Sequence, residues 1–147
     1  LSVAESDIAR RSYLSTTVRQ RLHQSEFREK VLHAYRTSCA FCHLKHRELL
    51  DAAHIIPDRE PEGLPIVTNG LALCKLHHAA FDAFMIGVRP DGVIEIRHDL
   101  LAEFDGPVLQ HGIKNLHGTK IISPIHKGLR PGKRFLEWRY ERFLEAV

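Results

Sequence analysis

The sequence lacks any apolar run approaching the roughly 20 residues that a membrane-spanning helix requires, and no secretory signal peptide is visible at its start. It contains three cysteines, too few for the paired disulfide framework of a small secreted protein. Internal repeats and low-complexity segments are also missing. These absences argue against a membrane protein or a disulfide scaffold, and they favour a protein of the reducing cytoplasm.

What remains is the composition of an ordinary globular protein. The 147 residues suit one domain with a modest core, and 27% of them are charged. The formal net charge of +3 favours a polyanionic partner. Basic side chains gather near the C-terminus, where Lys127, Arg130, Lys133 and Arg134 could follow phosphates.

The cysteines are spaced as metal ligands. Cys39 and Cys42 form a C-x-x-C pair, and Cys74 and His77 form a C-x-x-H pair. Four soft ligands in two such pairs are typical of a closed structural zinc site. His43 lies beside Cys42 and could compete for the fourth position, but the spacing favours His77.

A second set of polar residues surrounds the C-x-x-H pair. His54 ends a short apolar run, Asn69 lies fifteen residues later, and His78 and Asp82 are four residues apart. On a helix, residues four apart point the same way. Two hairpin strands and a helix would therefore gather two imidazoles, an amide and a carboxylate, the equipment for metal-assisted hydrolysis of a phosphodiester.

Each of these side chains has a chemical role in that hypothesis. His54 is the candidate general base, because a neutral imidazole accepts a proton from water near pH 7. His78 and Asp82 are the candidate ligands of a catalytic Mg²⁺, Mn²⁺ or similar ion. The amide of Asn69 would bridge backbone groups and hold His54 in place. Asp51 is a further candidate ligand, or else it orients His54 or lies on the surface.

With these residues, the sequence resembles the HNH nucleases, and in particular the HNH domains of bacterial restriction endonucleases. The segments AAHIIP and NGLALC-x-x-HH carry the resemblance, which extends over residues 27–97. His54, Asn69 and His78 match the three residues after which the family is named. The resemblance departs at Ala53, where many HNH sites have an Asp or His ligand. Asp51, two residues earlier on the same strand face, could replace that ligand, or Asp82 could suffice.

The resemblance implies an α+β fold with a ββα-metal core and structural zinc, flanked by helices and an additional β-hairpin. It implies a metal-dependent DNA endonuclease, the cleavage domain of a bacterial restriction enzyme. The alternative is a zinc-stabilised nucleic-acid-binding module that has lost catalysis, which Ala53 keeps open.

The expected organisation is a linker or arm over residues 1–15 and a nuclease domain over residues 16–147, with the zinc and catalytic core at about 37–97. The first residue is Leu1 and no base-reading motif is visible, which favours a fragment whose N-terminal target-recognition domain lies outside this sequence. A homodimer is compatible with the sequence.

Periodicity and turn residues predict the elements around this core. Before the core, we expect a helix over 18–35, capped by Ser15, Thr16 or Thr17, with a second possible start at Ser25. The core itself should consist of strands over 49–56 and 71–73 and a helix over 75–83, with Leu76, Phe81 and Phe84 on its core side. After it, we expect a hairpin of 85–89 and 93–97, a short helix over 99–104, a strand over 120–123 and a helix over 135–147.

Overall fold

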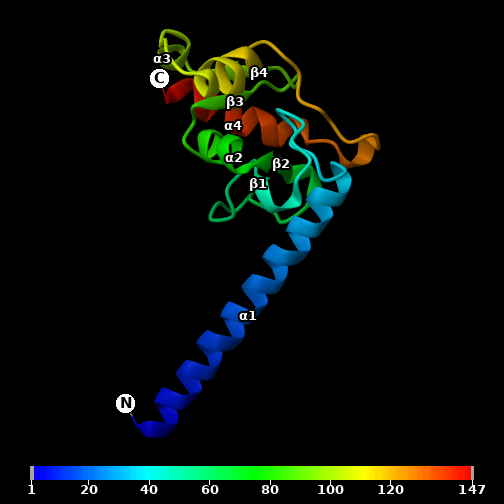
Figure 1. Ribbon diagram of the computed structural model, residues 1–147. Coiled ribbons are helices and arrows are strands. Elements are labelled where there is room, and N and C mark those ends of the chain that lie inside the picture. The colour runs from blue at the N-terminus through cyan, green and yellow to red at the C-terminus, as the bar shows by residue number, and fades with distance from the viewer. Residues whose placement is uncertain (1, 147) are drawn as a thin grey trace.

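The computed structural model describes residues 2–146 and consists of a rounded body with a long helical arm (Figure 1). The arm is helix α1 (Val3–Ala34), whose 32 residues span about 48 Å at the usual rise of an α-helix. Its N-terminal end points away from the body, and its last turns pack against the body (Figure 1). No helix among the described residues is long and apolar enough to cross a membrane.

The centre of the body is a hairpin followed by a helix. Strand β1 (Leu50–His54) pairs antiparallel with strand β2 (Gly70–Cys74), and helix α2 (Lys75–Asp82) follows β2 directly. The register places His54 opposite Gly70 and Leu50 opposite Cys74. All five residues of β2 are buried, so both faces of this strand are covered. The α+β architecture with a ββα core, expected from the sequence, is confirmed.

Helix α1 covers one face of this hairpin with its last turns. Phe27, Val31 and Leu32 are buried there, and each such side chain contributes about 1.5–3 kcal/mol by leaving water. The helix approaches β2 so closely that a Cβ on Gly70 would lie 2.5 Å from Val31 Cγ2. This close contact explains why glycine follows Asn69 at the start of β2.

A second hairpin and a C-terminal helix complete the body. Strands β3 (Ile86–Val88) and β4 (Ile94–Ile96) pair antiparallel, and the short helix α3 (His98–Leu101) follows. Helix α4 (Lys133–Glu145) packs on β3, where a Cβ on Gly87 would lie 2.5 Å from the ring of Phe143. Between α3 and α4 the chain forms only short helical turns and loops.

The predicted helix start at Ser15, Thr16 or Thr17 is wrong. Helix α1 begins twelve or more residues earlier, where Ser2 and Glu5 form a capping box. The hydroxyls of Thr16 and Thr17 donate to carbonyls four residues back, as they do inside a helix. The helix also continues unbroken through Ser25, so no second helix starts there. Position 1 of the expected linker lies outside the described residues.

Two further predictions differ from the structure. Residues 120–123 form no strand, because Lys120 makes a single β-bridge to Val93 and the amide of Ile122 donates to the loop carbonyl of Ala40. Leu76 was expected in the core but is 43% exposed, because it lies on the side of α2 away from the buried Phe81.

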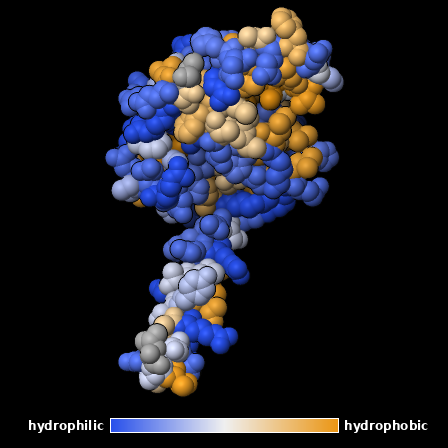
Figure 2. Space-filling model, turned by 90° about the vertical axis from the view of Figure 1, so that its left-hand side faces the viewer, coloured by the Kyte–Doolittle hydropathy of each residue, from blue (hydrophilic) through white to orange (hydrophobic). Residues whose placement is uncertain are grey.

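Figure 2 shows hydrophilic and apolar side chains side by side along the arm. Exposed apolar residues of α1 occur over its whole free length, and they are Val3, Ile8, Tyr13, Leu14, Val18 and Leu22. Arginines lie among them, so the arm has no continuous apolar stripe.

Candidate metal centre and active site

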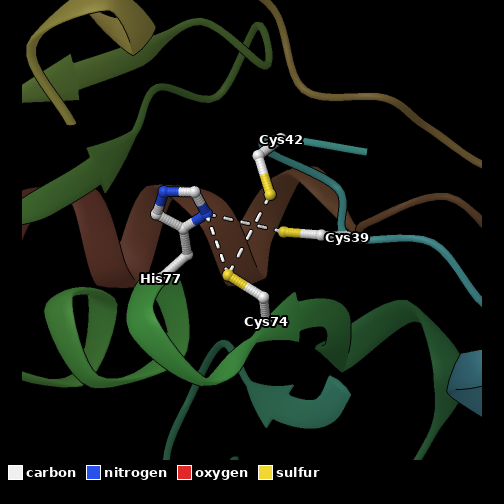
Figure 3. A group of neighbouring side chains, drawn as sticks. All are labelled: Cys39, Cys42, Cys74 and His77. Atoms are coloured by element: carbon white, nitrogen blue, oxygen red, sulfur yellow. Dashed lines mark hydrogen bonds between the residues drawn. The ribbon is translucent and has the colours of Figure 1, made fainter. Parts of the chain in front are cut away.

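Four side chains from two segments of the chain converge beside α2 (Figure 3). The ligand atoms of Cys39, Cys42, Cys74 and His77 all lie within 4.8 Å of one another. His77 Nδ1 is 3.3 Å from Cys74 Sγ and 3.6 Å from Cys39 Sγ, and the sulfurs of Cys42 and Cys74 are 4.0 Å apart. Ligands of a tetrahedral zinc ion lie about 3.6–3.8 Å apart. The cluster could therefore bind zinc.

Local structure presents these ligands from two rigid turns. Cys39 and Cys42 lie in the tight loop after α1, where the amide of His43 donates to the carbonyl of Cys39. Cys74 is the N-cap of α2, and His77 lies in its first turn. His43 is exposed with a positive φ of 67° and is not in the cluster, so the spacing argument for His77 agrees with the geometry.

The outer nitrogen of His77 also has a partner. Nε2 donates to the carbonyl of Gly112 at 2.6 Å, which fixes the tautomer that leaves Nδ1 free for a metal. Burial lowers the pKa of His77, but its hydrogen bonds to Cys39 and Gly112 outweigh burial and raise it. The segment around Gly112 is thereby tied to the cluster.

The thiols differ in how readily they ionise. The hydrogen bond with Cys74 lowers the pKa of Cys39, and the same contact, together with burial, raises the pKa of Cys74. Burial also raises the pKa of Cys42. Because zinc binds thiolates, the ion would displace the protons that Cys42 and Cys74 otherwise retain.

On the other side of α2 lies an open cleft of about 310 Å³. Three of the predicted site residues line it: His54 from the end of β1, and His78 and Asp82 from α2. The remaining lining residues are Ala52, Pro57, Asp58, Arg59, Phe84 and Arg139. The structure thus brings the two histidines and the carboxylate to one surface.

His54 is held by an aromatic contact. Its ring stacks on Phe27 of α1, with the ring centroids 4.2 Å apart and the planes inclined by 24°. Burial lowers the pKa of His54, so the ring is neutral at pH 7. Its Nε2 is buried, with no hydrogen-bond partner among residues 2–146.

His78 lies between two carboxylates. Its Nδ1 is 2.9 Å from Asp51 Oδ2, and its Nε2 is 3.2 Å from Asp82 Oδ2. The hydrogen bond to Asp82 raises the pKa of His78, with a further contribution from Asp51. Burial opposes ionisation of Asp82, but the hydrogen bond from His78 and nearby positive charges hold its pKa below the usual value.

This arrangement separates the two candidate carboxylate ligands. Two ligands of an octahedral Mg²⁺ lie about 3 Å apart, and the His78 Nε2 to Asp82 Oδ2 distance is close to that separation. Asp51 contacts the opposite nitrogen of His78, and its other oxygen accepts from Lys75 at 2.5 Å. Its partner is thus His78, not His54, and its position is that of a carboxylate that orients a metal-bound histidine.

Asn69 is completely buried below the cleft. Its Oδ1 accepts from the amide of Ile56 at 2.8 Å, and its Nδ2 donates to the carbonyls of Ile56 and Leu64 at 3.1 and 3.0 Å. Its own carbonyl accepts from the amide of Ile55. The side-chain amide of Asn69, at the end of the hairpin loop, is therefore bonded to Ile56 at the start of that loop, two residues after His54.

Two residues of this site escaped the sequence reasoning. Phe27 lies within the predicted helix over 18–35 but was given no role in the site, although it stacks on His54. Arg139 was not considered, although it lines the cleft. The available signal for Arg139 was its position three residues after Leu136 and four before Phe143, on the apolar face of a helix, where a charge requires a reason.

The ββα motif, with histidines at the strand end and on the helix and a Cys₃His cluster beside it, is the arrangement that the resemblance to HNH nucleases predicts. The family model described as HNH endonuclease matches residues 39–89, which include the cluster and all the candidate catalytic residues. This match confirms the resemblance to HNH endonucleases and supports a nuclease function.

Among solved structures, the chain is similar to the modification-dependent TagI restriction endonuclease, with 16% identity and a TM-score of 0.53. The similarity covers 80% of this chain and 37% of that one, so the chain spans well under half the length of this neighbour. At this identity the similarity is one of fold. No curated protein matches the sequence.

Proposed function

We propose that this chain is a metal-dependent endonuclease that hydrolyses phosphodiester bonds in DNA. The observation that carries the proposal is the cleft itself, where a neutral, half-buried His54 lies beside the His78 and Asp82 pair. A general base and a pair of ligands for a divalent ion are the two parts that such hydrolysis requires.

In this proposal, each side chain has one task. Nε2 of His54 is shielded, so the other ring nitrogen, Nδ1, takes the proton from the attacking water. The stack on Phe27 and the bridge through Asn69 keep the ring aimed at the cleft. His78 and Asp82 would hold the ion, while Asp51 orients the ring of His78 through its contact with Nδ1. A bound Mg²⁺ or Mn²⁺ would neutralise charge on the phosphate and the leaving oxygen.

Zinc has a separate, structural task in this proposal. All four ligands of the cluster are protein side chains, so no position remains for substrate, as in closed structural sites. The cluster joins the loop after α1 to the start of α2, one residue before His78. Zinc would therefore fix the helix that carries the catalytic ligands.

DNA as the substrate is supported by what surrounds the cleft. A second hollow, of about 380 Å³, continues from His54 along α1, where Gln20, His23 and Gln24 line it. These polar side chains can donate hydrogen bonds to a phosphate backbone. The open shape and the net charge of +3 suit an extended polyanion better than a small enclosed substrate.

A nicking assay tests the proposal directly. Supercoiled plasmid incubated with the zinc-loaded protein should be converted to relaxed and linear forms when Mg²⁺ or Mn²⁺ is added, and not in chelator. The alternative, an inactive zinc-stabilised binding module, is favoured by Ala53, which is fully buried and offers no ligand. Plasmid that is bound but remains intact with every divalent ion would support that alternative.

Binding to DNA is expected to depend steeply on salt. Each phosphate contact adds about −0.9 to the slope of log K against log salt. Lys127 and Lys133 are exposed, whereas the guanidinium of Arg130 donates to the carbonyls of Pro124 and Ile125. Replacing both lysines by glutamine should therefore reduce the magnitude of the slope by about 2, measured by fluorescence anisotropy.

The control for this measurement is Lys114→Gln. Lys114 already donates to the carbonyl of Glu103 and lies over the ring of Phe104, so its loss should leave the slope unchanged. A slope near zero for the unmodified protein would show that these charges serve only solubility.

A further inference from the structure

Arg139 is a cation buried in the wall of the cleft. Its side chain comes from α4, fifty residues beyond the segment that matches the HNH family model, and the residue is 3% exposed. The neighbours on its helix face, Leu136 and Phe143, are ordinary core residues. An arginine in such a position is costly unless its hydrogen bonds are satisfied.

The guanidinium joins the two halves of the ββα motif. Nη1 donates to the carbonyl of Ile55 at 3.0 Å, and Nη2 donates to the carbonyl of Phe81 at 2.7 Å. Ile55 directly follows His54, and Phe81 directly precedes Asp82. One rigid fork therefore connects the backbone beside the candidate base to the backbone beside the candidate metal ligand.

Both carbonyls are ones that the motif leaves available. Ile55 lies one residue beyond the last pair of the β1–β2 ladder, and its carbonyl has no backbone donor among the described residues. Phe81 is in the last turn of α2, where a cation is favoured, and its carbonyl, which accepts from the amide of Phe84 at 3.1 Å, has a second lone pair free for Arg139. The fork geometry of arginine, with two parallel donors, fits two such acceptors, whereas a lysine ammonium is a point charge.

Aromatic rings hold the guanidinium in place. Its central carbon lies 4.0 Å from the ring centre of Phe81 and 4.5 Å from that of Phe84. Burial lowers the pKa of Arg139 to about 10, so the group stays charged at pH 7. No carboxylate among the described residues forms a salt bridge with it, although the charge of Asp82 acts on it.

A buried charge in this environment is not explained by stability alone, because replacing such a charge by an apolar side chain of similar size is often neutral or stabilising. The charged guanidinium and its two donors are therefore better explained by a role in fixing the geometry of the site. We propose that Arg139 is a positioning residue of the nuclease site, which sets the separation between His54 and the His78–Asp82 pair through the carbonyls of Ile55 and Phe81. This inference rests on the proposed function.

The test compares Arg139→Met, which keeps the stem but loses both hydrogen bonds, with Arg139→Lys, which can make one. Arg139→Met should lower kcat on plasmid by about 10²-fold, since a displacement of about 1 Å has that effect, with DNA affinity unchanged. Arg139→Lys should fall between this variant and the unsubstituted protein. The Mn²⁺ affinity of the DNA-free protein, from electron paramagnetic resonance, should decrease in the same order.

Arg142→Met is the matched control. Arg142 is on the same helix, stacks on Trp138 at 3.7 Å and donates to the carbonyl of Trp138, but it is not in the cleft. It should leave kcat and Mn²⁺ affinity unchanged. Zinc content and circular dichroism should be normal in all three variants.

The outcomes are decisive in either direction. Unchanged kcat and Mn²⁺ affinity in a folded Arg139→Met would overturn the proposal. Should that variant unfold, Arg139→Lys decides: wild-type values for both quantities overturn the proposal, and a lower kcat at unchanged DNA affinity supports it. If the unsubstituted protein never cuts, the proposed function fails, but the order of Mn²⁺ affinities still tests the positioning role.

Discussion

His54→Ala is expected to abolish detectable cleavage of DNA while binding of DNA persists. The substitution removes the proposed acceptor of the proton from water and leaves the candidate metal ligands on α2 in place. Loss of a general base typically lowers the rate by about 10²–10⁴-fold. The measurement is single-turnover plasmid nicking with Mg²⁺, alongside fluorescence anisotropy for binding.

His98→Ala is the control, because His98 is exposed on α3 and does not line the cleft. It should cut at the rate of the unsubstituted protein. A His54→Ala protein that also cut at this rate would show that another group generates the nucleophile. Binding lost together with cleavage would indicate that His54 holds substrate instead of activating water.

The pH dependence of the unsubstituted protein gives an independent reading of the same role. A base works in its deprotonated form, which exists above its pKa. Because burial lowers the pKa of His54, the neutral form persists to lower pH than for a free histidine, whose pKa is about 6.5. The acid limb of kcat/KM should therefore have its midpoint below that value. Measured at saturating Mg²⁺, which keeps the candidate ligand His78 deprotonated, a midpoint above that value would contradict the role of a buried neutral base.

The sequence predicted the parts of the site whose geometry is local. Cys74 and His77 share one turn of a helix, and His78 and Asp82 share one face, so spacing alone determines how they lie. The hairpin followed from a run that ends at His54 and an Asn-Gly pair that starts the return. The two helical pairs depend on four or five consecutive residues, and the hairpin depends on two short runs joined by a loop.

The partner of Asp51 could not be predicted in this way. Strand alternation indicated which face Asp51 occupies, but not which histidine it meets. The register, which places Asp51 opposite Leu73, brings it beside the start of α2 and hence to Nδ1 of His78. The contact of Asp51 with His78 therefore depends on how β1 lies relative to α2, which the sequence alone does not give.

Contacts between residues far apart in the sequence could not be predicted from it either. Arg139 contacts Ile55 across 84 positions of sequence, and Phe27 contacts His54 across an interval that no periodicity spans.

The start of α1 was mispredicted for a different reason. Residues 3–16 of the helix are all exposed, so no buried apolar stripe makes the helical period visible in that part of the sequence.

Cys39→Ser is expected to remove zinc and a large part of the stability. Cys39 is completely buried, and its sulfur is 3.6 Å from His77 Nδ1, so a serine hydroxyl would replace a ligand in a dry environment. In small zinc modules, metal binding supplies about 10–16 kcal/mol toward the folded state. The hairpin that carries the site is only five residues long in each strand, so zinc would add to the stability that burial of α1 against β2 supplies.

The measurements are zinc content by elemental analysis and thermal unfolding with and without chelator. The unsubstituted protein should contain one zinc per chain, and chelator should lower its Tm toward that of Cys39→Ser, whose own Tm should not respond. Because His77 donates through Nε2 to Gly112, loss of zinc should also speed amide hydrogen exchange around residues 108–116. Folded protein without zinc, or a Cys39→Ser protein of unchanged Tm, would show that the four side chains form an ordinary buried cluster and not a metal site.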